Sequence, residues 1–167
     1  MPGVLFVCTA NICRSPVAEA LFADWLAKQG LPGDWEVTSA GTWAQPGLPA
    51  STYSRDVLAA LGLDLSRHHA RRVDREMLEK ADVVLCMTRS QAEALQAEFP
   101  PLASRIRLLA EMAGSGYDIS DPYGGPRRGY EDMAAELQHL VELGGARIVA
   151  LARGPAGGGP AGAGDYR

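Results

Sequence analysis

One short segment sets the architecture expected for this chain: Cys8-Thr9-Ala10-Asn11-Ile12-Cys13-Arg14-Ser15-Pro16. Residues 3–7 before it form an apolar run of strand length, and residues 18–26 after it carry apolar side chains at helical spacing. The segment is therefore predicted to be the turn between a strand and a helix, with Pro16 in the first helical turn and Ser15 as the N-cap. Such a turn points backbone N–H groups and the positive end of a helix into one concavity, which predicts an anion site.

Two side chains of this segment indicate nucleophilic chemistry at the anion site. Cys8 stands where the strand ends, and Arg14 follows after five intervening residues. A loop of that length can curl so that Arg14 and the backbone amides surround a tetrahedral oxyanion above the Cys8 sulfur. The positive field favours a thiolate over a thiol, and the planar guanidinium suits two phosphate oxygens. The pattern therefore predicts a phosphate site with a thiolate nucleophile.

These residues and their setting resemble the low-molecular-weight protein tyrosine phosphatases. A Cys-x5-Arg pattern alone is loose, but residues 7–16 match the signature of that family nearly residue for residue. The resemblance extends over residues 3–152. It implies an α/β fold with a four-stranded parallel sheet flanked by helices on both faces, of the flavodoxin-like (phosphotyrosine phosphatase I-like) type. It also implies a single phosphatase domain over residues 1–153.

The pattern of the remaining chain predicts alternating strands and helices. A strand, a helix of about four turns and a second strand favour a right-handed βαβ unit and a parallel sheet. Further strands are expected at residues 35–40, 83–87 and 105–111, and helices at residues 54–61, 74–80, 92–99 and 130–143. Gly144 and Gly145 are expected to break or weaken the last helix, which residues 148–151 would resume.

The long loop predicted at residues 117–129 carries a second candidate motif, Asp121-Pro122-Tyr123-Gly124-Gly125. Phosphoryl transfer to a thiolate needs an acid to protonate the leaving oxygen, and the same group can then act as base on the attacking water. The family resemblance places its general acid in this Asp-Pro motif, so Asp121 is the candidate catalytic acid. The resemblance assigns Tyr123 to the wall of the substrate cleft.

The resemblance also implies supporting roles around the phosphate loop, which we define as residues 8–15. It places the serine at the end of the second strand, Ser39, beneath the loop; the alternative is a polar strand end without such a role. It implies that His68, in the pattern His-x-Ala-Arg, hydrogen-bonds to Asn11; by itself this basic segment reads as a solvated surface. Ser15 is expected to hydrogen-bond the Cys8 sulfur and stabilise the thiolate. The other phosphate-loop residues carried over from the family are Thr9, Ala10, Ile12 and Cys13.

Two more residues have alternative interpretations. Trp43 begins a Pro- and Gly-rich loop at residues 43–50, at the edge of the sheet where active-site walls form. It either lines the cleft for an aromatic ring or covers the edge of the core. Cys13 lies five residues from Cys8. The resemblance implies that it forms a protective disulfide with an oxidised Cys8; the alternative is a small side chain that packs the loop.

Composition limits the classes of function. The 167 residues suffice for one domain, and the net charge of −4 argues against general nucleic-acid binding. No apolar run is long enough for a membrane span, and no secretory signal is evident. The three cysteines are too few for a disulfide scaffold, and a thiol nucleophile needs a reducing compartment, so a cytoplasmic location is expected. Residues 154–167, eleven of which are Gly, Pro or Ala, are predicted to form a flexible tail.

No metal or other cofactor is expected, because no third ligand stands at metal-binding spacing from His68 and His69 and because Arg14 and the loop amides supply positive charge. The expected partner is a phosphotyrosine-containing protein, with a tyrosine kinase, a regulator of surface polysaccharide and a host protein as candidates. The expected state is a monomer or weak dimer. Whether Arg71, Arg72, Arg127 and Arg128 form a docking rim or a solvated surface stays open.

Three alternative functions are considered. Protein-arginine phosphatases are close relatives with a similar loop, but they carry threonine at the place of Ile12, whose apolar bulk favours phosphotyrosine. Arsenate reductases use a similar loop with two further cysteines set close together, whereas this chain offers only Cys86, inside a predicted strand. A non-catalytic phosphopeptide-binding module would not require an acid such as Asp121.

Overall fold

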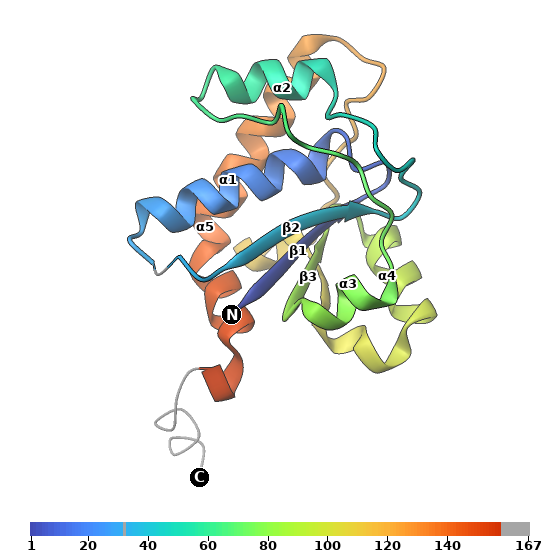
Figure 1. The fold of residues 1–167 in the computed structure, drawn as a ribbon, viewed down its shortest axis with the longest axis vertical. Helices are drawn as coiled ribbons and strands as arrows, with labels where there is room; N and C mark the ends of the chain where they lie inside the picture. Colours follow the sequence, from blue (N-terminus) through green and yellow to red (C-terminus); the bar gives the residue numbers. More distant parts are fainter. Residues whose placement is uncertain (32, 158–167) are drawn as a thin grey trace.

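The computed structural model describes residues 1–31 and 33–157, and the sheet lies at their centre (Figure 1). Its four strands are all parallel, in the order β2-β1-β3-β4. They are β1 (Gly3–Cys8), β2 (Glu36–Gly41), β3 (Val83–Cys86) and β4 (Ile106–Leu108). The chain leaves β1 for β2 on one side and returns to β3 on the other, so the strand order reverses at the end of β1. In open α/β sheets, ligands bind at such a switch point, which here is followed by the phosphate loop.

Helices cover both faces of the sheet, as predicted (Figure 1). On one face lie α1 (Arg14–Lys28) and α5 (Arg127–Gly157), which contact each other, and α2 (Thr52–Ala59) packs beyond them. On the other face lie α3 (Arg75–Lys80) and α4 (Arg89–Glu98). Two short 3-10 helices, η1 (Pro100–Arg105) and η2 (Leu109–Ala113), flank β4. The α/β class and the parallel sheet with two helical layers are thus confirmed.

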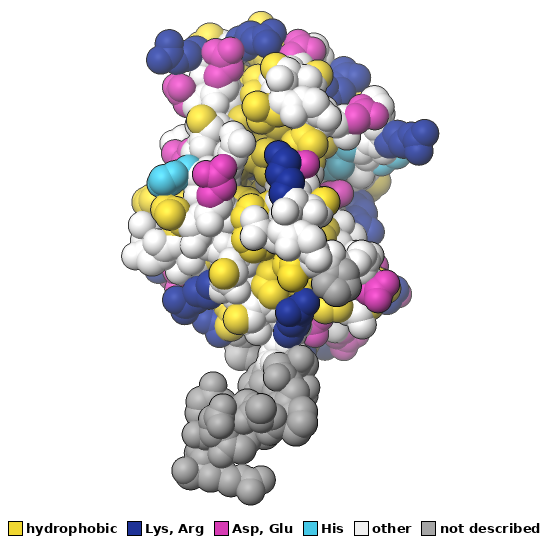
Figure 2. All heavy atoms as spheres, turned by 90° about the vertical axis from the view of Figure 1, so that its left-hand side faces the viewer, with side chains coloured by type: hydrophobic (Ala, Val, Ile, Leu, Met, Phe, Trp, Pro, Cys, Tyr) yellow, Lys and Arg dark blue, Asp and Glu magenta, His cyan; other side chains and the backbone are white. Residues whose placement is uncertain are grey.

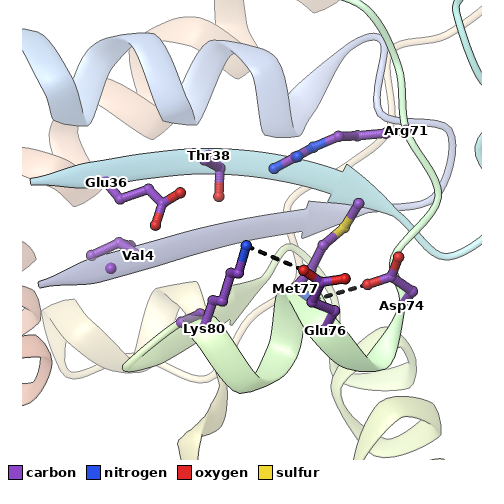
Figure 3. Close-up of a pocket in the computed structure, with 10 residues that line it drawn as sticks. Val4, Glu36, Thr38, Arg71, Asp74, Glu76, Met77 and Lys80 are labelled. Carbon is purple, nitrogen blue, oxygen red and sulfur yellow. Dashed lines mark hydrogen bonds and ion pairs between the residues drawn. The ribbon is translucent and has the colours of Figure 1, made fainter. Parts of the chain in front are cut away.

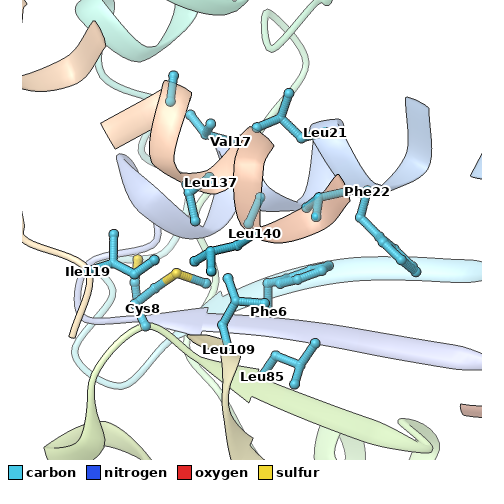
Figure 4. Close-up of a cluster of buried hydrophobic side chains, with 14 of the residues drawn as sticks. Phe6, Cys8, Val17, Leu21, Phe22, Leu85, Leu109, Ile119, Leu137 and Leu140 are labelled. Atoms are coloured by element: carbon cyan, nitrogen blue, oxygen red, sulfur yellow. The ribbon is translucent and has the colours of Figure 1, made fainter. Parts of the chain in front are cut away.

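The core divides into two clusters because side chains alternate along β1. Phe6 and Cys8 point towards α1 and α5, whereas Leu5 and Val7 point towards α3 and α4. The first cluster contains large buried side chains such as Phe22, Leu85, Leu137 and Leu140 (Figure 4). The alternation therefore fixes the side of the sheet on which Cys8 emerges, beneath the first turn of α1.

The helix α5 runs through Gly144 and Gly145 without the break that the sequence suggested. The two glycines instead allow close packing. A Cβ atom on Gly144 would lie 2.8 Å from the Met112 Cβ, and one on Gly145 would lie 2.6 Å from the Trp25 ring. At Gly154 the backbone leaves helical geometry, with φ of 64°. The predicted tail, residues 154–167, lies outside the described residues from residue 158 onward.

The fourth strand is shorter than predicted. It ends at Leu108, and η2 follows because the Glu111 carboxylate accepts a hydrogen bond from the Leu108 amide at 3.0 Å. Before the strand, the guanidinium of Arg105 donates hydrogen bonds to Glu79 O at 3.0 Å and to Ala81 O at 2.9 Å. Arg105 thus binds carbonyl groups at the C-terminal end of α3 and ties that helix to β4.

Figure 2 shows the face that is turned to the left in Figure 1, where acidic and basic side chains are intermixed around exposed hydrophobic ones. Exposed apolar side chains of the chain include Leu61 and Leu143. Among residues 1–31 and 33–157, every helix is too short or too polar to cross a bilayer.

Candidate active site

The phosphate loop curls back over the end of β1. Asn11 is fully buried and has a left-handed backbone, with φ of 59°, which a non-glycine residue adopts only when its surroundings hold it there. This conformation turns the Asn11 amide towards the Cys8 sulfur, at 3.3 Å. The curl therefore brings the backbone N–H of Asn11 to the Cys8 sulfur.

Four residues hold Asn11 in this conformation. The Asn11 Nδ2 group donates to Ser15 Oγ at 2.8 Å and to Ser39 Oγ at 2.9 Å. Its Oδ1 atom accepts from the Arg71 amide at 3.0 Å, and its backbone carbonyl accepts from His68 Nε2 at 2.7 Å. The structure thus places Ser39 and His68 against the loop. Arg71, which the His-x-Ala-Arg pattern contains, joins them and also donates from Nε to Ser39 O at 3.0 Å.

Cys8 lies beneath the loop with 2 % of its surface exposed, and its sulfur is 3.0 Å from Ser15 Oγ. Ser15 is not the N-cap of α1, as the sequence had suggested. Cys13 occupies that position, and Ser15 is the second residue of the helix. Its hydroxyl is engaged by Cys8 and Asn11 instead of capping a helical amide. The positive end of α1 thus faces the same pocket as the sulfur.

Arg14 is 96 % buried in the same site, and not all of its guanidinium N–H groups are hydrogen-bonded. Its Nη1 donates to the carbonyl of Ile119 at 2.9 Å, and its Nη2 lies 3.5 Å from Asp121 Oδ2. Its Nε–H is buried and has no hydrogen-bond partner among the described residues. A buried donor without an acceptor is costly, so this atom is suited to an anion that enters the loop.

A pocket of about 370 Å³ opens above the sulfur. Its base is the phosphate loop, and its walls come from residues 43–48 and from Asp121 and Tyr123. Trp43 lines the wall with 74 % of its surface exposed, and the Arg72 guanidinium lies 4.8 Å from its ring centroid. Trp43 therefore lies in the wall of the pocket and does not cover the edge of the core, which was the alternative. The lining side chains are those of Cys8, Thr9, Ala10, Ile12, Cys13, Arg14, Trp43, Gln45, Leu48, Asp121 and Tyr123.

A comparison with protein families gives one match that spans most of the chain. Residues 3–144 match the model of the low molecular weight phosphotyrosine protein phosphatases. The chain belongs to this family. The family accounts for the parallel sheet and for the position of the cysteine-containing loop after its first strand.

Individual relatives agree with this assignment. A probable low molecular weight protein-tyrosine-phosphatase, EpsP of Ralstonia solanacearum, is 38% identical over 89% of this chain and 97% of its own. A protein-arginine-phosphatase of Geobacillus stearothermophilus is 36% identical over 83% of this chain and 90% of its own. The crystal structure of a low molecular weight protein tyrosine phosphatase from T. tengcongensis superposes with a TM-score of 0.80 at 40% identity, over 85% and 96% of the two chains.

The second cysteine of the phosphate loop, Cys13, is 97 % buried. Its sulfur lies 3.5 Å from Ser51 Oγ and 3.7 Å from the Tyr130 hydroxyl. Burial raises the pKa of the Cys13 thiol above its ordinary value, and the nearby Asp121 and Cys8 raise it further. Burial also raises the pKa of Tyr130, to about 12. The hydrogen bonds with Ser51 and Tyr130 lower the pKa of Cys13 in part, but the net shift is upward, so the thiol loses its proton less readily than an exposed one. The cysteines Cys8, Cys13 and Cys86 are all free.

A second hollow, of about 200 Å³, lies between the starts of β1 and β2 and the helix α3 (Figure 3). Its side chains carry both signs, among them Glu36, Arg71 and Lys80, and Lys80 is paired with Glu76 at 3.2 Å. It contains no cysteine and no part of the phosphate loop. Among the described residues, no three His, Cys, Asp or Glu side chains are grouped so that they could bind a metal ion.

Sequence reasoning did not identify several residues of the site. Gln45 and Leu48 lie in the loop that was expected to wall the cleft, so their positions after β2 were the available signal. Ile119, whose carbonyl binds Arg14, carries no such signal, because any residue offers a backbone carbonyl.

Proposed function

We propose that this phosphatase hydrolyses phosphotyrosine on proteins through a cysteinyl-phosphate intermediate. The observation that carries the proposal is the buried Nε–H of Arg14, which no other described residue binds and which shares the pocket with the Cys8 sulfur and the curled loop. Together they form a positively polarised cup for a tetrahedral anion, with a nucleophile at its base.

In the first step, the Cys8 thiolate attacks phosphorus in line, and an S–P bond forms as the bond to the phenolic oxygen breaks. Arg14 and the loop amides bind the three equatorial oxygens, over which negative charge spreads in the transition state. Asp121 gives its proton to the departing oxygen. In the second step, Asp121 accepts a proton from water, which attacks phosphorus and releases phosphate and the Cys8 thiolate.

The position of Asp121 supports this role. Its carboxylate lines the mouth of the pocket, its side chain is 48 % exposed, and its Oδ1 accepts from the Tyr123 amide at 3.1 Å. The contact between Asp121 and Arg14 is long, at 3.5 Å, and exposed at one end. A phosphate dianion in the loop is a stronger partner for Arg14, which frees the carboxyl group for the leaving oxygen.

The walls of the pocket favour an aromatic phosphate ester. Trp43, Tyr123 and Leu48 present apolar surface around the opening, and Ile12 adds an apolar side chain from the loop itself. A phenyl ring fits such walls with its phosphate directed to the loop. The second candidate substrate is phosphoarginine, because a relative named protein-arginine-phosphatase is 36% identical. The apolar Ile12 beside the phosphate favours phosphotyrosine over the polar guanidinium.

The proposal includes a redox property, a compartment, partners and an oligomeric state. Cys13 is in the same loop as Cys8 and lines the same pocket, so after oxidation of Cys8 to a sulfenic acid the Cys13 thiol can condense with it to a disulfide with loss of water. Such an enzyme needs thiols to stay reduced, which supports the cytoplasm as its compartment. Its partners are phosphotyrosine-containing proteins, a tyrosine kinase among the candidates, and it works as a monomer or weak dimer.

The test is the turnover of p-nitrophenyl phosphate and of phosphotyrosine, phosphoserine and phosphoarginine peptides by the wild type and by Cys8→Ser. We expect hydrolysis of the aryl phosphate and the phosphotyrosine peptide, loss of it in Cys8→Ser, and no change on addition of a chelator. A preference for phosphoarginine would contradict the argument from Ile12. Near-normal turnover by Cys8→Ser would rule out the mechanism.

A further inference from the structure

The first turn of α4 is attached to the phosphate loop through a buried glutamine. Gln91 is 94 % buried, and its Oε1 accepts hydrogen bonds from the amides of Thr88 at 3.0 Å and Met87 at 3.1 Å. Its own amide is capped by Thr88 Oγ1, which completes a capping box. From this fixed position Gln91 Nε2 donates to Thr9 Oγ1 at 3.0 Å, next to Cys8. The Gln91–Thr9 hydrogen bond therefore fixes the position of the first turn of α4 relative to Cys8.

The same turn holds the segment that leads to Asp121. The backbone amide of Arg89, the first residue of α4, donates to Asp118 Oδ1 at 2.8 Å. The Arg89 guanidinium donates to the carbonyl of Gly116 at 3.0 Å, and the amide of Ile119 donates to the carbonyl of Met87 at 3.0 Å. Two hydrogen bonds thus fasten residues 116–118 to the first residue of α4, and a third fastens Ile119 to Met87, two residues before that helix.

Ile119 connects the anchored segment to the active site. Its side chain is 99 % buried and lies near Cys8 in the core (Figure 4), and its carbonyl binds Arg14 at 2.9 Å. Only Ser120 separates Ile119 from Asp121. After Asp121, the hydrogen bonds described for residues 122–125 run within the loop itself, as from Tyr123 N to Asp121 Oδ1. The anchors before Asp121 therefore determine where its carboxyl group lies.

We propose that Asp118 is a positioning residue for the general acid Asp121. It acts by docking the acid loop, which we define as residues 116–125, on the N-terminus of α4. A carboxylate is the favourable group at this place, because the first amide of a helix has no partner within the helix and the helix dipole attracts negative charge. Asp118 is exposed and does not line the pocket, so its effect reaches the reaction through Ile119 and Asp121. The inference rests on the phosphatase function proposed above.

The dependence of kcat/KM on the leaving group provides the test, because a mere loss of protein stability would not change it. Phenolate is a poor leaving group and needs the proton of Asp121, whereas 2,4-dinitrophenolate is stable as an anion and leaves without it. The ratio kcat/KM reports the steps up to formation of the cysteinyl phosphate, because the phenol departs there. It is therefore insensitive to the second step, in which Asp121 acts on water for every substrate.

The experiment compares kcat/KM for phenyl phosphate and 2,4-dinitrophenyl phosphate in the wild type, Asp118→Ala and Asp118→Asn. We expect Asp118→Ala to lower the value for phenyl phosphate about tenfold, since misplacement of a catalytic group by about 1 Å can cost up to about 100-fold, and to leave that for 2,4-dinitrophenyl phosphate within about threefold. Asp118→Asn keeps an oxygen acceptor for the Arg89 amide, so its kcat/KM for phenyl phosphate should lie between those of the wild type and Asp118→Ala. Competitive inhibition by inorganic phosphate should not change, because the phosphate loop is intact.

Asp74→Ala is the matched control. Asp74 is the N-cap of α3, and its Oδ1 accepts from the Met77 amide at 2.9 Å, much as Asp118 accepts from the first amide of α4. Asp74 lies in the hollow of Figure 3, away from the loop that carries Asp121. It should leave the ratio of the two substrates unchanged. An unchanged ratio in both Asp118 variants, or an equal fall in Asp74→Ala, overturns the positioning role while the wild-type activity stands. A wild type that hydrolyses neither ester overturns the phosphatase function and this inference with it.

Discussion

The hydroxyl oxygen of Ser15 lies 3.0 Å from the sulfur of Cys8, and a thiolate at this distance, having no proton, can only accept the hydrogen bond. Asn11 Nδ2 donates to the same oxygen at 2.8 Å, so one lone pair of Ser15 is occupied. The hydroxyl hydrogen is then free to point at the sulfur, where it stabilises a thiolate. The network around Asn11 therefore supports the loop and also orients a donor towards the nucleophile.

Replacement of Ser15 by alanine is expected to slow alkylation of Cys8 by iodoacetamide at pH 7 about tenfold, because a hydrogen bond to a charged group contributes about 1.5 kcal/mol or more. The matched control is Ser39→Ala. Ser39 accepts the other hydrogen of Asn11 Nδ2 at 2.9 Å, so its loss disturbs Asn11 in the same way and leaves the Cys8–Ser15 contact in place. Equal alkylation rates in the two variants would show that Ser15 acts only through the loop.

Ser15 also shows where prediction from the sequence reached its limit. Its position before an apolar helical pattern suggested an N-cap, but a cap forms only if the hydroxyl is free to bind a helical amide, and here Cys8 and Asn11 engage it. The fourth strand ended early for a similar reason, because Glu111 binds the Leu108 amide that would otherwise continue the ladder. In both cases a side-chain contact overrode the local pattern.

The larger features were predictable because their signals are local. Residues 3–8 and 83–86 are continuous apolar runs, as expected for parallel strands buried on both faces. The bonds that align the site are different. Gln91 binds Thr9 across 82 positions of sequence, and Arg14 binds the Ile119 carbonyl across 105. Neither pairing has a periodicity or motif to show it, so the docking of the acid loop became visible only in the fold.

Trp43→Ala is expected to raise KM for a phosphotyrosine peptide several-fold while the inhibition constant of inorganic phosphate changes by less than about twofold. The indole lines the pocket wall, where the proposed function places the ring of the substrate, whereas phosphate alone would reach only the loop. Trp43→Phe keeps an aromatic face and should recover most of the affinity. Loss of phosphate inhibition in Trp43→Ala would instead indicate that the backbone contact from Trp43 N to Thr9 O, at 2.9 Å, has moved the loop.

Peroxide treatment followed by dithiothreitol is expected to restore most of the activity of the wild type and much less of that of Cys13→Ala. Condensation of a Cys8 sulfenic acid with the Cys13 thiol stops oxidation before the irreversible sulfinic acid. Mass spectrometry should show the oxidised wild type lighter by two hydrogen atoms. Cys86→Ala is the control, because Cys86 is fully buried in β3, and it should recover like the wild type. Equal recovery in Cys13→Ala would assign Cys13 to packing alone.

Glu136 is expected to make the stability of the protein depend on pH in the acidic range. Within residues 1–31 and 33–157, its buried Oε1 has no hydrogen-bond partner, and burial raises the pKa of the carboxyl group above its ordinary value of 4.5. The folded state therefore binds the proton more tightly than the unfolded state does. The stability that this group contributes is complete below about pH 4.5 and is lost as the pH rises through the folded-state pKa.

Glu136→Gln removes this titration, so the variant should gain thermal stability relative to the wild type between about pH 4 and pH 7. The gain should be less than about 1 kcal/mol, because much of the side chain remains in contact with solvent. The measurement is Tm against pH for the two proteins, with Glu142→Gln, an exposed residue of the same helix, as the control. A difference between wild type and Glu136→Gln that stays constant from pH 4 to pH 7 would mean that the Glu136 carboxyl group titrates alike in the folded and unfolded states.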